Sequence, residues 1–114
     1  MAYASSRDLL SALKYFSLAR KINPTNPDIN NNLGGIYAEL GQLEKAIYHL
    51  KQALEYDPDN ANSHSNLGHI SVMTGQPEMA AAHYREALRL DPEHVNAGRG
   101  LASLYKKFPG LEDE

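Results

Sequence analysis

The chain of 114 residues contains no cysteine, so it can form neither a disulfide bond nor a metal site built on thiolates. No apolar run approaches the length of a membrane span, and the first residues lack the hydrophobic segment of a signal peptide. Lys and Arg number 11 against 14 Asp and Glu, for a net charge of −3, which gives no basic footprint for nucleic acid. These absences predict a soluble, intracellular, cytoplasmic protein that binds no nucleic acid and inserts into no membrane.

What the sequence does contain is a repeat. Three prolines, Pro24, Pro58 and Pro92, are evenly spaced along the chain. Other residues that share their period are Leu33, Leu67 and Leu101; Ala12, Ala46 and Ala80; and Ala19, Ala53 and Ala87. A fixed period of roughly 20–50 residues indicates supersecondary units stacked in an array, whose product is a long surface. The period therefore favours a protein that binds a partner over one that converts a substrate.

The apolar residues recur with helical spacing. Leu33, Ile36, Tyr37 and Leu40 lie at positions i, i+3, i+4 and i+7, which is one face of a helix. The pattern predicts helices over 6–22, 28–40, 44–56, 62–74, 78–90 and 95–108, and no strand-like alternation occurs. The short loops between them make neighbouring helices antiparallel. The expected fold class is all-α.

Particular residues mark the helix boundaries and the closest packing. Asn26 and Asn60 precede helices and are suited to cap them, whereas Gly41 follows the last apolar position of a helix and is suited to stop it. A glycine inside a helix costs roughly 1 kcal/mol relative to alanine. Gly34 and Gly68 therefore predict places where another helix crosses closely.

These phased residues resemble the tetratricopeptide repeat, whose pattern runs W-x2-L-G-x2-Y, then A-x3-F, then P over about 34 residues. The matching segments are Leu33-Gly34-x2-Tyr37, Ala46-x3-Leu50 and Pro58 in the unit 27–60, and Leu67-Gly68-x2-Ser71, Ala80-x3-Tyr84 and Pro92 in the unit 61–94. The departures are Asn30, His64 and Gly98 at the tryptophan place and Ser71 at an aromatic place. We expect these departures to thin the packing without changing the fold.

The resemblance implies a right-handed α-solenoid of antiparallel helix pairs, forming a single array over residues 1–114. Its parts are a partial repeat 1–26, full repeats 27–60 and 61–94, a partial repeat or capping helix 95–108, and a tail 109–114. The last helix presents Leu101, Leu104, Tyr105 and Phe108, and the preceding unit is expected to cover only part of this face. Residues 112–114 are expected to be a solvated tail.

In this family the first helix of each unit lines a concave groove that binds extended peptides. Carried over to this chain, the family's groove positions are Asp28, Asn31, Asn32, Gly35, Glu39, Asn62, Ser65, Asn66, His69, Val72, Met73, Asn96, Arg99, Ser103 and Lys106. The nine implied as peptide-binding residues are Asn31, Asn32, Asn62, Ser65, Asn66, His69, Asn96, Arg99 and Lys106. Asn32 and Asn66 occupy equivalent places, and a carboxamide can pair with a peptide N–H and C=O together. Similar asparagines line the repeats of O-linked N-acetylglucosamine transferases. The alternative, that these asparagines only start helices or pack between them, remains open.

Some family members grip the C-terminal carboxylate of heat-shock chaperones with lysine, arginine and asparagine. Asn66 fits the middle place of this clamp. Asn31 and Gly35 stand where its first lysine and asparagine belong, and Asn96 and Gly100 stand where its last two cations belong. The sequence therefore excludes this clamp.

No pattern in the sequence indicates catalysis or a bound metal or cofactor. Candidate nucleophiles and bases are scattered over exposed helical positions. His64 and His69 are about 140° apart around a helix and cannot chelate together, and His49 and His83 are expected on the outer face of second helices. The leading interpretation is a non-catalytic scaffold for a protein or peptide partner. The alternatives are a module whose open ends mediate homo-oligomerisation, and a substrate-recruiting arm of a larger enzyme of the O-GlcNAc transferase type.

Overall fold

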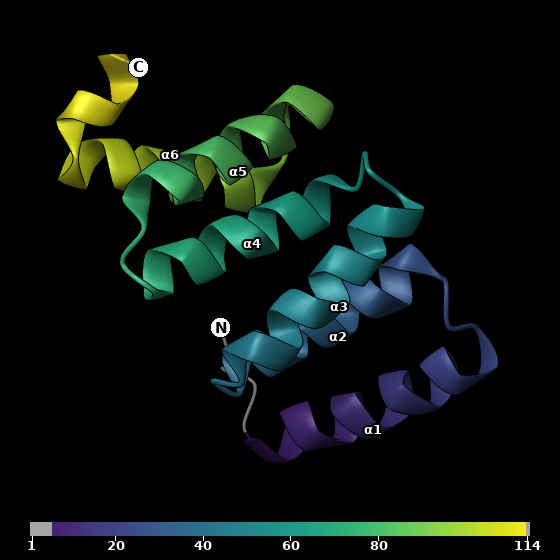
Figure 1. Ribbon diagram of the computed structural model, residues 1–114. Helices are drawn as coiled ribbons and strands as arrows, with labels where there is room; N and C mark the ends of the chain where they lie inside the picture. Colours follow the sequence, from purple (N-terminus) through teal and green to yellow (C-terminus); the bar gives the residue numbers. More distant parts are fainter. Residues whose placement is uncertain (1–5, 114) are drawn as a thin grey trace. The chain divides into compact units, whose positions relative to one another are not determined.

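The computed structural model describes residues 6–113, and this part of the chain is helical throughout (Figure 1). The α-helices are α1 (Ser6–Ile22), α2 (Pro27–Glu39), α3 (Leu43–Tyr56), α4 (Ala61–Met73), α5 (Pro77–Leu90) and α6 (Val95–Lys107), followed by the 3-10 helix η1 (Pro109–Asp113). Within residues 6–113 there is no strand, which confirms the all-α class. None of the helices described there combines the length and apolar character needed to cross a membrane.

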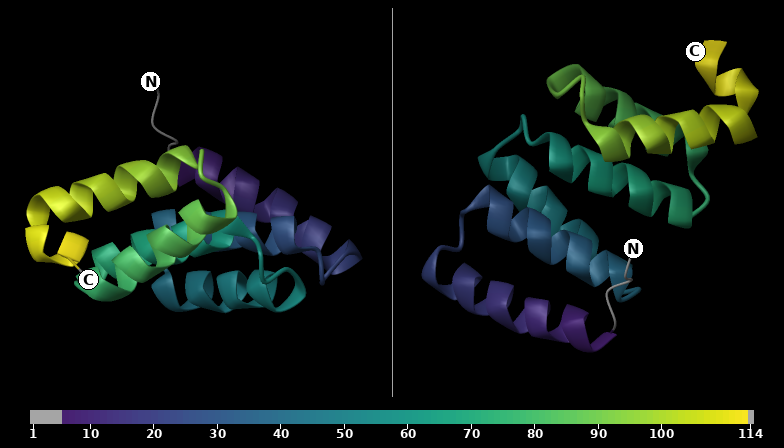
Figure 2. Two further views of the ribbon diagram at one scale, coloured as in Figure 1. Left: turned by 90° about the horizontal axis from the view of Figure 1, so that it is seen from above. Right: turned by 180° about the vertical axis from the view of Figure 1, so that it is seen from behind.

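The chain divides into two compact units, unit 1 (Met1–Pro58) and unit 2 (Asp59–Glu114). Unit 1 holds α1, α2 and α3, and unit 2 holds α4, α5, α6 and η1. Within each unit, consecutive helices pack side by side and run in opposite directions (Figure 2). The tightest pairs are α2 with α3 and α4 with α5, which are the two helices of each full repeat.

The helix ends follow from the residues placed there. Asn26 Oδ1 accepts the N–H of Ile29 at 3.0 Å, and Asn60 Oδ1 accepts the N–H of Ser63 at the same distance. Each bond satisfies one of the donors that a helix N-terminus leaves without an intrahelical partner. Gly41, with φ of 79°, takes the left-handed conformation in the turn after α2. The predicted caps and stop are confirmed.

Glycine allows the close helix pairing in both units. A Cβ on Gly34 would lie 2.5 Å from Leu50 Cγ, and a Cβ on Gly68 would lie 2.8 Å from a ring carbon of Tyr84. Leu50 is fully buried and Tyr84 is nearly so. The predicted close crossings at the two glycines are therefore confirmed, and the bulky side chains fill the space that the missing Cβ atoms leave.

The C-terminal end differs from the expected solvated tail. Glu112 and Asp113 belong to η1, and the side chain of Leu111 is buried in the core of unit 2; residue 114 lies outside the described part. Arg85 fixes this turn, because its Nη2 donates to the carbonyl of Leu111 at 2.6 Å and its Nε donates to Tyr105 Oη at 2.9 Å. The turn packs into the same cluster as the apolar face of α6, so less of that face is exposed than the sequence predicts.

Replacing Gly34 by alanine is expected to destabilise the protein despite the better helix propensity of alanine. The gain in propensity is up to about 1 kcal/mol, whereas forcing a methyl group into a packed contact typically costs about 1–3 kcal/mol. We expect the free energy of unfolding in urea to fall by about 1–2 kcal/mol.

Gly98→Ala is the matched control, because Gly98 lies inside α6 and a Cβ there meets nothing within 4 Å. Its free energy of unfolding should rise by roughly 0.5–1 kcal/mol. Equal effects of the two substitutions would contradict the role assigned to the contact between α2 and α3.

Candidate peptide-binding site

Unit 2 contains a cavity of about 500 Å³ between its helices. The lining residues come from α4, the following turn, α5, α6 and the end of α6: His69, Val72, Gly75, Gln76, Pro77, Tyr84, Gly100, Ser103, Leu104, Lys107 and Phe108. Gly100 lets the ring of Tyr84 pack directly against α6, because a Cβ on Gly100 would collide with that ring. The buried ring of Tyr84 and the backbone of Gly100 thus form part of the cavity lining between α4 and α6.

The chemistry of the cavity is mainly apolar with polar groups around it. Val72 and Phe108 are large apolar side chains that stay partly exposed to solvent. His69, Ser103 and Lys107 supply polar and charged groups, and Lys107 Nζ lies 5.6 Å from the centroid of the Phe108 ring. Burial raises the pKa of Tyr84, so its phenol stays neutral. Such a site suits an apolar side chain whose neighbours are polar or acidic.

The residues that the resemblance assigns to the groove fall into three groups. On α2 of unit 1, Asn32 is exposed and Asn31 is mostly buried. On α4 of unit 2, Asn62 and His69 are exposed, Asn66 is half-buried and Ser65 is buried. On α6, Asn96, Arg99 and Lys106 are exposed. Of these nine residues His69 lines the cavity, together with Val72 and Ser103, which the resemblance also places in the groove. Gly100 and Lys107 line it as well, and they are not among the groove positions that the resemblance implies.

Asn62 is held by a neighbouring helix. His94 caps α6, where its Nδ1 accepts the N–H of Ala97 at 3.1 Å, so its proton sits on Nε2. That Nε2 lies 2.7 Å from Asn62 Oδ1 and donates to it. The carbonyl of Asn62 is therefore engaged by the cap of α6, and its amide group is the part that can donate to a ligand.

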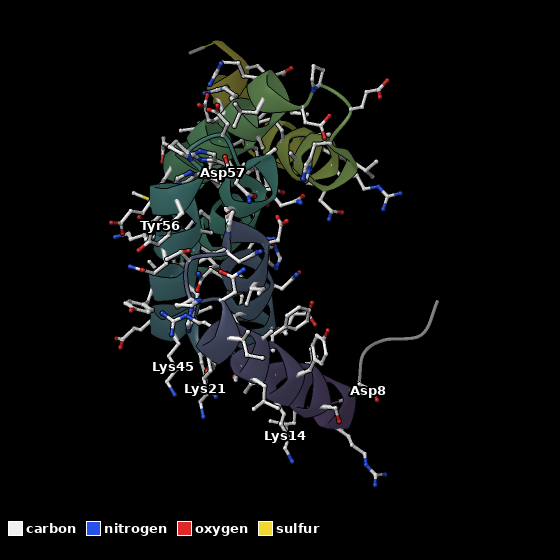
Figure 3. The ribbon with its side chains drawn as sticks, turned by 90° about the vertical axis from the view of Figure 1, so that its right-hand side faces the viewer. Asp8, Lys14, Lys21, Lys45, Tyr56 and Asp57 are labelled. Carbon is white, nitrogen blue, oxygen red and sulfur yellow. The ribbon has the colours of Figure 1, made fainter. Side chains whose placement is uncertain are left out.

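Unit 1 has a smaller cavity of about 300 Å³ with a different character. It is lined by Ser17, Arg20, Lys21, Pro24, Leu33, Tyr37 and His49. Lys45 Nζ lies 5.6 Å from the centroid of Tyr37, so a third cation lies beside the lining. Figure 3 shows Lys14, Lys21 and Lys45 projecting from this side of unit 1. The face is cationic, whereas the cavity of unit 2 is mainly apolar.

The tryptophan place of unit 1 holds a polar network. Asn30 is fully buried, and its Nδ2 donates to the carbonyls of Pro24 and Asn26 at 3.1 and 3.3 Å. Its Oδ1 accepts from Arg20 Nε at 3.0 Å and from His49 Nδ1 at 3.2 Å. Hydrogen bonds therefore occupy the carboxamide of Asn30 on both sides.

The equivalent place of unit 2 holds two histidines. His64 and His83 stand one repeat after Asn30 and His49, and their Nδ1 atoms lie 3.4 Å apart. The prediction that His49 and His83 lie on the outer face is wrong, since both are half-buried, His49 against α2 and His83 against α4. Burial lowers the pKa of both rings, and the charge of Arg20 lowers that of His49 further, as His64 does for His83. His49 follows Asn30 by 19 residues, and His83 follows His64 by 19 residues. A search for polar residues with the same separation in successive repeats could have revealed both pairs.

Comparison with known proteins assigns this fold to a class of repeat modules. Models described as "Tetratricopeptide repeat" match residues 15–48 and 61–94, and one described as "TPR repeat" matches residues 34–75. No curated protein sequence matches the chain. The chain belongs to the tetratricopeptide-repeat family, whose fold serves as a protein–protein interaction module.

Solved structures agree with this assignment. The Arabidopsis OM64 TPR domain has 24% identity and a TM-score of 0.79, covering 88% of this chain and 83% of its own. A mutant of the O-GlcNAc transferase of Thermobaculum terrenum has 31% identity and a TM-score of 0.80, covering 86% of this chain but only 19% of the enzyme. The first TPR of Spaghetti (RPAP3) bound to the HSP90 peptide SRMEEVD has 19% identity and a TM-score of 0.78, covering 89% and 80%. All three support the all-α tetratricopeptide-repeat fold.

The two buried histidines give a prediction for stability against pH. Their lowered pKa values in the folded state mean that the unfolded chain takes up protons first as the pH falls. The free energy of unfolding should therefore be level above about pH 7 and decline below the unfolded value of about 6.5. The double variant His49→Gln/His83→Gln should show a smaller decline between pH 7.5 and 5.5 in urea titrations in metal-free buffer.

The exposed His69→Gln variant is the control for this measurement and should keep the decline of the original chain. If the double variant declines as steeply as the original chain, groups other than these two rings control the acid sensitivity.

Proposed function

We propose that unit 2 binds an extended peptide segment of a partner protein and inserts one apolar side chain of it into the cavity over Tyr84. The observation that carries this proposal is the cavity itself, which is large enough for one side chain and has an apolar lining. It lies between α4 and α6, the first helices of successive repeats. The scaffold needs no catalytic residue of its own for this role.

The charges on the two helices define the partner further. Neither α4 nor α6 contains an aspartate or glutamate, whereas α6 carries Arg99, Lys106 and Lys107. Acidic residues on either side of the apolar one would meet these cations and the partial charges of His69 and Ser103. The proposed partner segment is therefore one apolar residue flanked by acidic residues.

Amides on α4 and α6 supply partners for the peptide backbone. Asn62 offers its amide group and Asn96 offers an exposed carboxamide. Asn66 is half-buried on α4, and Asn32, the equivalent residue in unit 1, is exposed. A carboxamide can donate to a peptide C=O and accept from a peptide N–H. These groups would hold the backbone of the segment with little dependence on its sequence.

The comparisons support the class of ligand. Spaghetti's TPR domain, which shares the fold, binds a peptide that combines a methionine with acidic residues. The carboxylate-clamp places of this chain hold Asn31, Gly35, Asn96 and Gly100, so a terminal carboxylate is not part of the proposed recognition.

A displayed peptide library should yield binders enriched in one apolar residue between acidic ones. Lys107→Glu should weaken a selected peptide at least tenfold, because it places a like charge at the mouth of the cavity. Asn66→Ala should weaken it severalfold by removing a backbone contact. Both affinities are measured by fluorescence polarisation, with helicity checked by circular dichroism.

Lys51→Glu makes the same charge change on the exposed side of α3 in unit 1 and is the matched control. Peptides that lose affinity equally in Lys107→Glu and Lys51→Glu would reveal a general charge effect and count against the cavity. A library that yields no saturable binder would count against the function.

Self-assembly is the second candidate, and α1 favours it. Tyr15, Leu18 and Ile22 follow one another at i, i+3 and i+7 and are 68, 55 and 86% exposed. An apolar stripe of this kind on a helix marks an interaction surface. A recruiting arm of a larger enzyme, the third candidate, is supported by the 31% identity to the O-GlcNAc transferase, and its catalytic domain would lie outside these 114 residues.

Light scattering at increasing protein concentration tests self-assembly. The original chain should gain mass toward a dimer, and Leu18→Lys/Ile22→Lys should remain at the monomer mass of about 12.6 kDa because charge on the stripe opposes its burial. A chain that keeps the monomer mass at the highest concentration would sink this candidate.

A further inference from the structure

The His64–His83 pair of unit 2 has a spacing that a hydrogen bond explains poorly. The two Nδ1 atoms are 3.4 Å apart, whereas protein hydrogen bonds from N–H groups are usually about 2.7–3.2 Å long. The rings are tilted by 33° with centroids 5.7 Å apart, so they do not stack face to face. The two nitrogens converge without direct tight contact.

The same spacing fits two nitrogens bound to one tetrahedral metal ion. Zinc–imidazole bonds are about 2.0–2.1 Å long, and two such bonds at a tetrahedral angle place their nitrogens roughly 3.3–3.4 Å apart. A square-planar arrangement, which copper(II) and nickel(II) favour, would bring them to roughly 2.8–2.9 Å. The separation in unit 2 therefore fits a tetrahedral ion such as zinc better than a square-planar one.

The surroundings favour neutral imidazole ligands and a nearby negative charge. A metal ligand must be the neutral ring, and burial together with the charge of His64 already disfavours protonated His83. Glu86 lies three residues after His83 on α5 and pairs with Arg89 at 2.7 Å. The hydrogen bond from Arg89 is the main cause that lowers the pKa of Glu86, and the positive charge of His64 contributes to the same shift.

We propose that His64 Nδ1 and His83 Nδ1 bind one Zn²⁺ ion, which links α4 to α5 of unit 2. Residues 6–113 bring no group of three or more histidine, aspartate or glutamate side chains together, so water completes the tetrahedron. Two protein ligands make the ion exchangeable, unlike the four-ligand sites that hold structural zinc. The open positions also allow a partner's carboxylate or imidazole to join the ion.

Unit 1 supplies an internal comparison. Asn30 stands where His64 stands one repeat later, and its carboxamide is consumed by four hydrogen bonds. Because the carboxamide oxygen of Asn30 is engaged in this way, it is not available as a metal ligand beside His49. The zinc site therefore belongs to unit 2, and His64→Asn reproduces in unit 2 the pair that unit 1 tolerates.

The test is calorimetric titration of the tag-free chain with ZnCl₂ at pH 7.5, together with thermal unfolding with and without zinc. The original chain should bind one equivalent and melt at a higher temperature with zinc, because an ion that binds only the folded state stabilises it. His64→Asn and His83→Gln should each weaken binding at least tenfold and abolish the thermal shift. His69→Gln and His49→Gln should bind as the original chain does.

Three outcomes would overturn the proposal. They are the absence of saturable zinc binding, an equal loss of affinity in His69→Gln, and full affinity in His64→Asn/His83→Gln. Circular dichroism of each metal-free variant verifies that the helices are intact, so that a loss of binding is not a loss of folding.

Discussion

The contact of a helical glycine with a bulky side chain on the next helix sets the geometry on which the rest of each unit depends. Gly34 meets Leu50, and Gly68 meets Tyr84, at distances that a Cβ atom would not allow. Because α2 and α3, like α4 and α5, approach each other at this point, the residues one turn away must be small or must form their own bonds. Ala46, Ala53, Ala80 and Ala87, all fully buried, supply the small residues. The free-energy cost of a glycine within each helix is offset by the apolar surface that the close pairing buries.

The same pairing brings position 30 of unit 1 next to position 49, and position 64 of unit 2 next to position 83. A family that usually places tryptophan there fills the space with one large ring, whereas this chain fills it with polar groups. Buried polar groups are tolerated only when hydrogen-bonded, and the network of Asn30 meets that condition. In unit 2 the two imidazoles face each other, which gives this unit a chemistry that unit 1 lacks. The equivalent positions 30 and 64 of the two repeats thus make different interactions.

Much of the fold could be predicted from the sequence, because its signals are local and repeated. Capping asparagines, stop glycines and apolar spacing determine helix ends closely, and the structure agrees at Asn26, Asn60 and Gly41. The η1 turn could not be predicted, because it depends on Arg85 reaching across to Leu111, a contact between positions far apart in sequence. The pairs of Asn30 with His49 and of His64 with His83 could not be predicted for the same reason. Pairing within one helix tests only neighbours such as His64 and His69, whereas the real partner of His64 lies on the next helix.

The candidate site was the least predictable part, because a cavity depends on what is missing as well as on what is present. Family positions point to side chains such as Asn66 and Arg99, yet the hollow is lined by residues such as Tyr84 and Gly100, which the packing of three helices brings together. Tyr84 touches both Gly68 of α4 and Gly100 of α6, so one ring serves the core and the cavity together. Its replacement would change folding and binding at once, whereas His69, Ser103 and Lys107 can vary without disturbing the pairing of α4 with α5. The chemistry at the rim of the cavity is therefore open to change, while the shape of the cavity depends on the packing that holds unit 2 together.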